Sequence, residues 1–483
     1  MPKLALLDQG FLLLESANSP RHVAGLQLYQ CPSRTRADFV SRLVEEFRQQ
    51  PPVPPFNWKL RAPVITPPSW IEDADFDIDN HLFHQALPAP GSMEQLRRHV
   101  ARLHARLLDR SRPLWEVHIF EGLGPGQFAV YTKIHHAYMD GVTMSRLTMA
   151  SLATNPRDRS KPALWANTQR SQRAREERKK VSASLFGTAR SLGRQVLLGP
   201  RVMKMFIQRG VAQAFGDRGL VLPFSAPRTL FNERLTAARA VGFSTLLLAD
   251  VKRLARDRNV TVNDVILTVC DIAMRDYLEE SGKAPEQPLV AEMPVSLRAK
   301  DDNSDAGNHL AIVLLEMAAD ESDPLDRLSQ VQQNAERAKT DAHQVAPEAA
   351  EAYTLLTQTA ATLGDLAGVS QHIRPLGNVV ISNLIGDHHP HYLRQAKMEC
   401  LYPISTIAPN TALNITIYTQ DGKMHFGLLA GKTAVTDPQH IADGIVEAFE
   451  ALKARAAQVA RSAVKKKKAR VARKKASKKT RSR

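Results

Sequence analysis

The chain has 483 residues, of which 43% are hydrophobic and 24% charged. This balance is typical of a globular protein of about two domains, and it excludes a fibrous or wholly disordered chain. No run of residues reaches the roughly 18 apolar residues that a membrane-spanning helix needs. Cys31, Cys270 and Cys400 lie far apart and lack the spacing of metal ligands, which favours a reducing, cytosolic compartment.

The net charge of +16 is concentrated in two segments. Residues 461–483 contain 13 Lys or Arg and no acid, and residues 170–209 contain 11 basic residues and two acids. The body of the chain is therefore not basic. Because residues 461–483 have almost no large apolar side chains, the sequence predicts a disordered Lys/Arg-rich tail there.

Residues 1–165 are predicted to form a first unit. Its signals are an alternating strand at 22–29, an amphipathic helix at 36–50 and a second helix at 93–109. Residues 166–225 form a basic crossover linker, in which apolar residues at 181–196 recur at helical spacing. That helix could pack on the body or lie on a lipid surface.

Near its end the first unit contains the stretch "YTKIHHAYMDGVTM", residues 131–144. Alternation from Gln127 predicts a strand whose one face continues to His136, while His135 belongs to the opposite face. A helix is predicted from Val142 to Leu152, with Asp140 capping its first turn. The two histidines should therefore have different roles.

Residues 226–457 are predicted to form a second unit. It contains helices at 248–257 and 263–280, a buried strand at 378–384 and a hairpin at 413–431 that turns at Asp421 and Gly422. Its end repeats the first unit, because a strand, a short loop, a capping Asp437 and a helix follow one another again. The histidines are missing from this copy. The sequence predicts a duplicated α/β fold, with a mixed sheet and flanking helices in each half and a site in a channel between the halves.

The histidine pair is the candidate catalytic group. A histidine at a strand end suits general acid–base catalysis because its pKa lies near neutrality. No nucleophilic serine or cysteine motif accompanies it, which favours direct transfer between two bound substrates. We expect Asp140 to be structural, either as a helix cap or as the partner of a buried arginine, and Gly141 to permit a close turn. No metal site is predicted.

At this point the motifs resemble those of the bacterial wax ester synthase/acyl-CoA:diacylglycerol acyltransferases, within the chloramphenicol-acetyltransferase-like, CoA-dependent acyltransferase superfamily. The resemblance covers about residues 4–455, and it departs from the family where Ile385, Gly386 and Asp387 follow the Ser-Asn pair in place of Pro-Gly. The similar segments are "LLDQGFLLLES", "HVAGLQLY", "SRPLWEVHIFEGL", His-His-x-x-x-Asp-Gly, "VNDVIL", "MPVSLR", "NVVISNLIGD" and "LYPISTIAPNTALNITI".

The resemblance implies two such domains and an O-acyltransferase that moves a fatty acyl group from acyl-CoA to a long-chain alcohol or to diacylglycerol. It makes His136 the general base and His135 a supporting residue. Asn263, Ser382 and Asn383 become candidates to bind the oxyanion or line the channel, with a helix cap as the alternative for Asn263. Arg298 becomes the candidate ion-pair partner of Asp140.

The resemblance implies no cofactor, since acyl-CoA is a substrate. Another acceptor, such as an amine or a polyketide alcohol in a condensation reaction, is the alternative function. A third interpretation is a non-enzymatic lipid-droplet or nucleic-acid-binding protein. We expect a cytoplasmic protein at the inner membrane or at lipid inclusions. Its tail could bind anionic lipid, bind nucleic acid as a secondary property, or only increase solubility.

Overall fold

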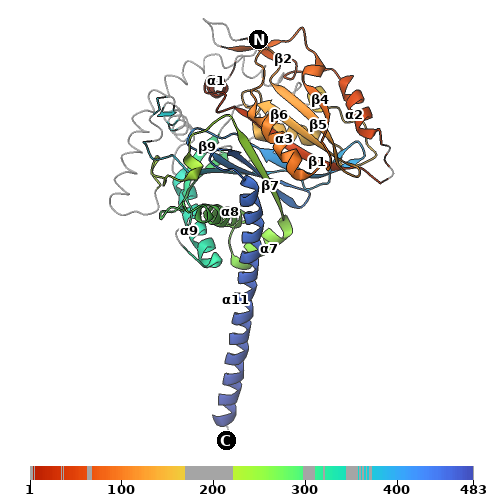
Figure 1. The fold of residues 1–483 in the computed structure, drawn as a ribbon. Coiled ribbons are helices and arrows are strands. Elements are labelled where there is room, and N and C mark those ends of the chain that lie inside the picture. The colour runs from red at the N-terminus through yellow and green to blue at the C-terminus, as the bar shows by residue number, and fades with distance from the viewer. Residues whose placement is uncertain are drawn as a thin grey trace.

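The computed structural model describes residues 4–61 except 5, 34 and 36, then 68–168, 221–296, 310–318, 321–343 and 372–481, with six isolated residues between 357 and 368. Most of the basic linker, including residues 181–196, and residues 297–309, which include Arg298, lie outside the described residues. Figure 1 shows two α/β halves side by side, with the last helix projecting from the second.

The first half begins with helix α1 (Leu6–Leu13) and contains a sheet of six strands in the order β11-β12-β1-β6-β5-β4. Its other elements are short or flank the sheet. The bounds are β1 (His22–Gln30), α2 (Phe39–Arg48), β2 (Trp58–Arg61), β3 (Ser69–Glu72), β4 (Leu82–Ala86), α3 (Met93–Ala105), β5 (Trp115–Gly124), β6 (Gln127–His135) and α4 (Gly141–Ala150).

The second half contains a sheet in the order β7-β14-β13-β10-β8-β9. Among the described residues its elements are β7 (Arg239–Leu247), α7 (Leu248–Arg258), α8 (Val262–Glu280), β8 (Val290–Ser296), β9 (Leu310–Glu316), α9 (Pro324–His343), β10 (Val379–Ile385), β13 (Leu413–Gln420), β14 (Lys423–Gly431) and α11 (Pro438–Arg481). Between β10 and β13 the chain also forms β11 (Tyr392–Leu393) and β12 (Ala396–Ile404), which lie in the first sheet.

The predicted duplication is confirmed by strand order and direction. In the first sheet β1, β6 and β5 are antiparallel neighbours, and β4 runs parallel to β5. In the second sheet β7, β14 and β13 are antiparallel neighbours, and β10 runs parallel to β13. In each sheet, the second of these strands leads through a short loop into a helix. The hairpin at 413–431 is also confirmed, because Asp421 and Gly422 have the positive φ angles of 46° and 72° that a two-residue turn needs.

One domain boundary needs correction. The sequence assigned all of 226–457 to the second unit, but β11 and β12 belong to the first sheet, where β12 pairs with β1. The two sheets also meet at β12, since a β-carbon on Gly427 of β14 would lie 1.7 Å from the Pro403 carbonyl oxygen of β12. Strand alternation reveals that β12 is a strand, but it carries no signal for its partner.

The predicted disorder of residues 461–483 is wrong as far as Arg481, because α11 continues to that residue (Figure 1). The disorder prediction rested on missing apolar residues, which limits tertiary packing. It ignored local propensity: after Gly444 the segment has no Gly or Pro and is rich in Ala, Lys and Arg, which favour helix. No helix of the described chain is both long enough and apolar enough to cross a bilayer.

Candidate active site

The histidine motif lies in the turn between β6 and α4. As predicted, Phe128, Val130 and Ile134 pack on one side of β6, while Ala129 and Tyr131 pack into the other core. Strand β6 ends at His135, and α4 begins at Gly141. The Asp140 carboxylate accepts a hydrogen bond from the Thr143 N–H at 2.6 Å, which confirms the predicted helix cap.

His136 is half-buried in this turn. Its backbone N–H donates to the Arg21 carbonyl at 2.8 Å, and its ring stacks on Phe11 of α1 with centroids 4.1 Å apart. Burial lowers the pKa of His136 to about 4, although the negative charge of Asp140 acts to raise it. The ring is therefore neutral at pH 7, which is the state in which a general base accepts a proton.

His135 is fully buried and points to different partners, as the strand alternation predicted. Its Nε2 lies 3.2 Å from Oε1 of Glu15, and its Nδ1 accepts the Ala137 N–H at 3.0 Å. Burial acts to raise the pKa of Glu15, but the contacts with His135, Arg21 and Arg110 lower it to about 2. His135 is thus held between an ionised carboxylate and the backbone of its own turn.

Gly141 does not make a turn that requires glycine, so that expectation was wrong. It is the first residue of α4, and its φ is not among the positive angles of the described residues. A β-carbon at Gly141 would lie 3.9 Å from Cδ1 of Leu384, an ordinary van der Waals distance. The more informative feature is this proximity, because it places the start of α4 near Leu384 of β10 in the second half.

Strand β10 carries the Ser-Asn pair. Ser382 is two residues before Leu384 and shares its face of the strand, whereas Asn383 is on the opposite face and exposed. Leu384 packs with the core of the first half, while Ile381 packs with the core of the second. Of the two candidates, Ser382 therefore lies on the face that meets the histidine motif. The strand is only partly buried, contrary to the buried strand that the sequence predicted.

Another predicted residue, Asn263, is not brought to His136 by the described contacts. Asn263 is the second residue of α8, and Thr261 is the cap of that helix, so the capping alternative for Asn263 is wrong. Helix α8 packs against α11, α9 and α7. Arg298 lies outside the described residues. Within the described chain, no group of three or more His, Cys, Asp or Glu side chains is arranged to hold a metal ion.

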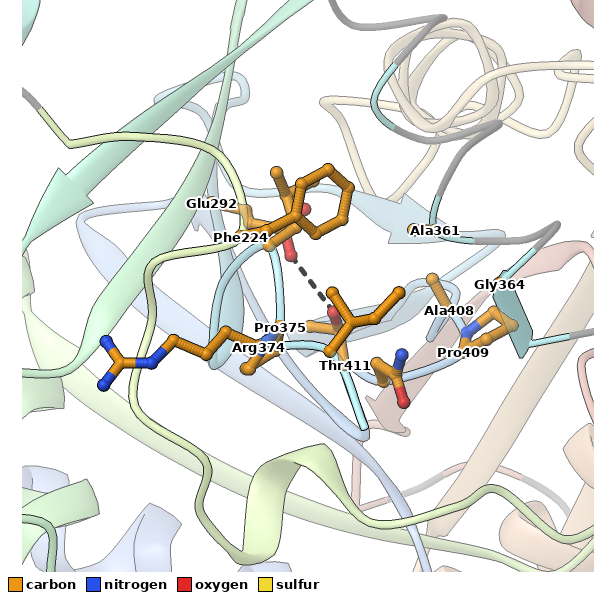
Figure 2. Close-up of a pocket in the computed structure, with 12 residues that line it drawn as sticks. Phe224, Glu292, Ala361, Gly364, Arg374, Pro375, Ala408, Pro409 and Thr411 are labelled. Atoms are coloured by element: carbon orange, nitrogen blue, oxygen red, sulfur yellow. Dashed lines mark hydrogen bonds between the residues drawn. The ribbon is translucent and has the colours of Figure 1, made fainter. Parts of the chain in front are cut away.

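A pocket opens in the second half, beside the loop that joins β12 to β13 (Figure 2). The Thr411 hydroxyl donates to the buried Glu292 carboxylate at 3.0 Å, while the Arg374 guanidinium extends away from them. The same loop contacts the first half, because the Ile407 carbonyl accepts from the Ser19 hydroxyl at 3.4 Å. None of the predicted site residues lines this pocket.

Sequence reasoning missed Glu15 and Phe11, although "LLDQGFLLLES" was noted as a similar segment. Phe11 has the helical spacing of a core residue, and Glu15 follows an apolar run as a single acid. A local pattern cannot show that these side chains contact histidines about 120 positions later in the sequence. The only available signal was a carboxylate next to an apolar run, which must find a partner if it is buried.

The fold places the chain in a broad structural class. It superposes on the first condensation domain of the calcium-dependent antibiotic synthetase with a TM-score of 0.55 at 13% identity, covering 94% of this chain and 96% of that one. It also superposes on the starter condensation domain of rhizomide synthetase with a TM-score of 0.52 at 13% identity, covering 94% of each chain. Identity this low shows the fold alone, which is the two-domain fold of CoA-dependent acyltransferases and condensation domains.

Sequence comparison identifies the family within that class. Residues 4–266 match the wax ester synthase/diacylglycerol acyltransferase catalytic domain, and residues 306–453 match the C-terminal domain of the same family. The chain belongs to the wax ester synthase/diacylglycerol acyltransferase family.

Individual relatives agree with this assignment. The chain is 33% identical to the O-acyltransferase WSD of Acinetobacter baylyi, over 93% of this chain and 96% of that protein. It is 34% identical to a protein of Mycobacterium tuberculosis named as a probable diacylglycerol O-acyltransferase, over 90% and 95%. It superposes on the wax ester synthase/diacylglycerol acyltransferase of Marinobacter aquaeolei VT8 with a TM-score of 0.74 and 30% identity, over 94% of this chain and 100% of that one.

Proposed function

We propose that this protein transfers a fatty acyl group from acyl-CoA to the hydroxyl of a long-chain alcohol or of diacylglycerol, with His136 as the general base. The similar proteins named above support this acceptor class. The observation that carries the role of His136 is its position, neutral and stacked on Phe11, at the end of β6 in a family that acts as O-acyltransferases.

The reaction proceeds in two steps, addition to the thioester and collapse of the tetrahedral intermediate. The neutral His136 ring takes the proton from the acceptor hydroxyl, and the oxygen attacks the thioester carbonyl carbon to give a tetrahedral oxyanion. Collapse of that intermediate breaks the carbon–sulfur bond, and the protonated His136 returns its proton to the departing CoA sulfur. A hydrogen-bond donor at the oxyanion is worth about 3 kcal/mol of the barrier, and we assign the Ser382 hydroxyl as the first candidate.

The test is CoA release from palmitoyl-CoA, with hexadecanol, dioleoylglycerol or hexadecylamine as the acceptor. Ester formation with either hydroxyl acceptor, lost in His136→Ala, supports the proposal. An active wild type that acylates only the amine would overturn the acceptor assignment and favour the condensation alternative. Retained ester formation in a folded His136→Ala variant would overturn the role of His136.

We also propose that the basic end of α11 contacts anionic lipid. The helix leaves the body and carries 12 basic residues and no acid between residue 461 and its end at Arg481 (Figure 1). Each Lys or Arg close to an anionic leaflet contributes about 1 kcal/mol, and the water-insoluble substrates of the proposed reaction are found at such surfaces. Such binding would place the enzyme on the inner membrane or on lipid inclusions.

Vesicle sedimentation tests this contact. The full chain should sediment with phosphatidylglycerol vesicles and not with phosphatidylcholine vesicles, and a chain ending at residue 460 should lose that difference. Tight binding of the full chain to duplex DNA without binding to anionic vesicles would assign the tail to nucleic acid instead.

A further inference from the structure

We infer that Glu15 is a positioning residue that fixes the orientation of both histidines of the motif. The inference rests on the proposed role of His136 as the general base. Glu15 follows α1, outside the histidine turn, and its side chain is only 2% exposed. A carboxylate this deeply buried is costly unless several partners compensate its charge.

The two carboxylate oxygens of Glu15 have separate partners. Oε1 lies 3.2 Å from His135 Nε2 and accepts the Arg21 backbone N–H at 3.1 Å. Oε2 accepts from Nη2 of Arg110 at 3.0 Å. The arginine is 44% exposed, so its ion pair contributes little to stability. Oε1 is therefore the oxygen that faces the active site.

The hydrogen bond from Ala137 fixes the tautomer of His135, and Oε1 lies 3.2 Å from the other ring nitrogen. Nδ1 of His135 accepts the Ala137 N–H at 3.0 Å, so Nδ1 carries no proton in the neutral ring. The ring proton must then be on Nε2, which faces Glu15. Histidines in functional sites are commonly held in one tautomer and one orientation by a second group.

The second contact of Oε1 reaches His136 through the backbone. Glu15 accepts the N–H of Arg21, and the carbonyl of Arg21 accepts the N–H of His136 at 2.8 Å. Two successive hydrogen bonds thus connect Glu15 to the residue whose ring must meet the substrates. A displacement of about 1 Å in such a group can reduce turnover about 100-fold.

Glu15 also compensates a buried cation beside the site. Arg21 is 7% exposed, and burial lowers its pKa to about 10, while the charge of Glu15 acts to raise it. The charge of Arg21 in turn lowers the pKa of His136. The titratable and charged groups around the histidine pair therefore include Glu15, Arg21, Asp140 and His22, which pairs with His135 across the sheet.

The test compares three substitutions that separate the two oxygens. Glu15→Gln keeps an oxygen at the Oε1 position but loses the negative charge that faces Arg110 and the buried Arg21. Glu15→Asp keeps the charge, but its chain is too short to hold the same contacts. Glu15→Ala removes both carboxylate oxygens. Arg110→Ala is the matched control, because it breaks the ion pair and leaves Oε1 in place.

We expect kcat to fall about 100-fold in Glu15→Ala and Glu15→Asp, to stay within about fivefold of wild type in Glu15→Gln, and to be unchanged in Arg110→Ala. KM for palmitoyl-CoA should be unchanged, because Glu15 acts through the histidines and not by binding the substrate. Thermal unfolding of each variant shows which chains are folded.

Wild-type kcat in folded Glu15→Asp or Glu15→Ala would overturn the inference. It would also be overturned if Glu15→Gln lost as much activity as Glu15→Ala, since the charge and not the position of Oε1 would then matter. If His136→Ala kept its activity, the proposed general base would fail instead, so the two failures are distinguishable.

Discussion

The turn after β6 and the turn after β14 have the same backbone hydrogen bond to the residue before the first strand of their half. In the first, the N–H of His136 donates to the carbonyl of Arg21, the residue before β1. In the second, the N–H of Lys432 donates at 3.1 Å to the carbonyl of Ala238, the residue before β7. Strand pairing gives the same match, because His135 pairs with His22 and Gly431 with Arg239.

The two turns differ in what surrounds the equivalent side chain. His136 is half-buried and stacks on Phe11, whereas Lys432 is exposed. The backbone turn therefore does not itself make an active site. The turn after β6 differs because Phe11 of α1 stacks on its histidine and burial lowers the pKa of that histidine.

The largest contrast should appear on removing the two equivalent side chains. His136→Ala should lower kcat by about 10²–10⁴-fold, the usual contribution of a general base, while Lys432→Ala should leave kcat unchanged. The measurement is CoA release at saturating palmitoyl-CoA and hexadecanol. A loss in Lys432→Ala comparable to that in His136→Ala would show that both turns act in catalysis.

Next in size is a pair of matched glycines in the first strands of the two halves. A β-carbon on Gly242 of β7 would lie 2.4 Å from the Pro438 carbonyl oxygen at the start of α11, whereas one on Gly25 of β1 would lie 3.7 Å from Met144 of α4. Gly242→Ala should therefore cost about 1–3 kcal/mol of unfolding free energy through overpacking, and Gly25→Ala much less. Urea denaturation would measure both, and equal costs would contradict this account.

A smaller effect is expected in the pH dependence of kcat/KM, which should report the pKa of His136. Below its folded pKa of about 4, His136 is protonated and cannot accept a proton, so kcat/KM should stay level as the pH falls to about 5 and decline only near pH 4. Asp140→Asn keeps a helix cap but removes the charge that raises this pKa, so the decline should shift to lower pH. A decline centred near pH 6.5, the usual histidine value, would show that the ring is not desolvated.

The smallest effect is expected at Gly141. Its φ is ordinary and a β-carbon there would make only an ordinary van der Waals contact, so Gly141→Ala should change the unfolding free energy by less than about 0.5 kcal/mol. Gly422, in the β13–β14 turn, has a φ of +72°, and Gly422→Ala should cost about 1–2 kcal/mol. Thermal unfolding of both variants checks the ranking.

Local signals predicted much of this site. Alternation placed His135 and His136 on different faces, and a capping residue placed Asp140 at a helix start, because both depend on a few neighbouring residues. The contact of Glu15 with His135 and the proximity of Leu384 to Gly141 join segments far apart in the sequence, and no local pattern encodes them. The prediction failed at Gly141 because glycine was assumed to need a special backbone conformation.

The pairing of β12 with β1 has a consequence for how the protein is made. During translation, one edge of β1 stays unpaired until β12 has been synthesised, because Leu28 pairs with Cys400, about 370 residues later in the sequence. At 5–20 residues per second, that edge stays open for roughly 20–70 s, long enough to attract other unpaired strands. Chaperones that shield nascent chains should therefore determine the yield of this enzyme, and a fragment that stops before residue 396 should aggregate instead of folding as an independent half.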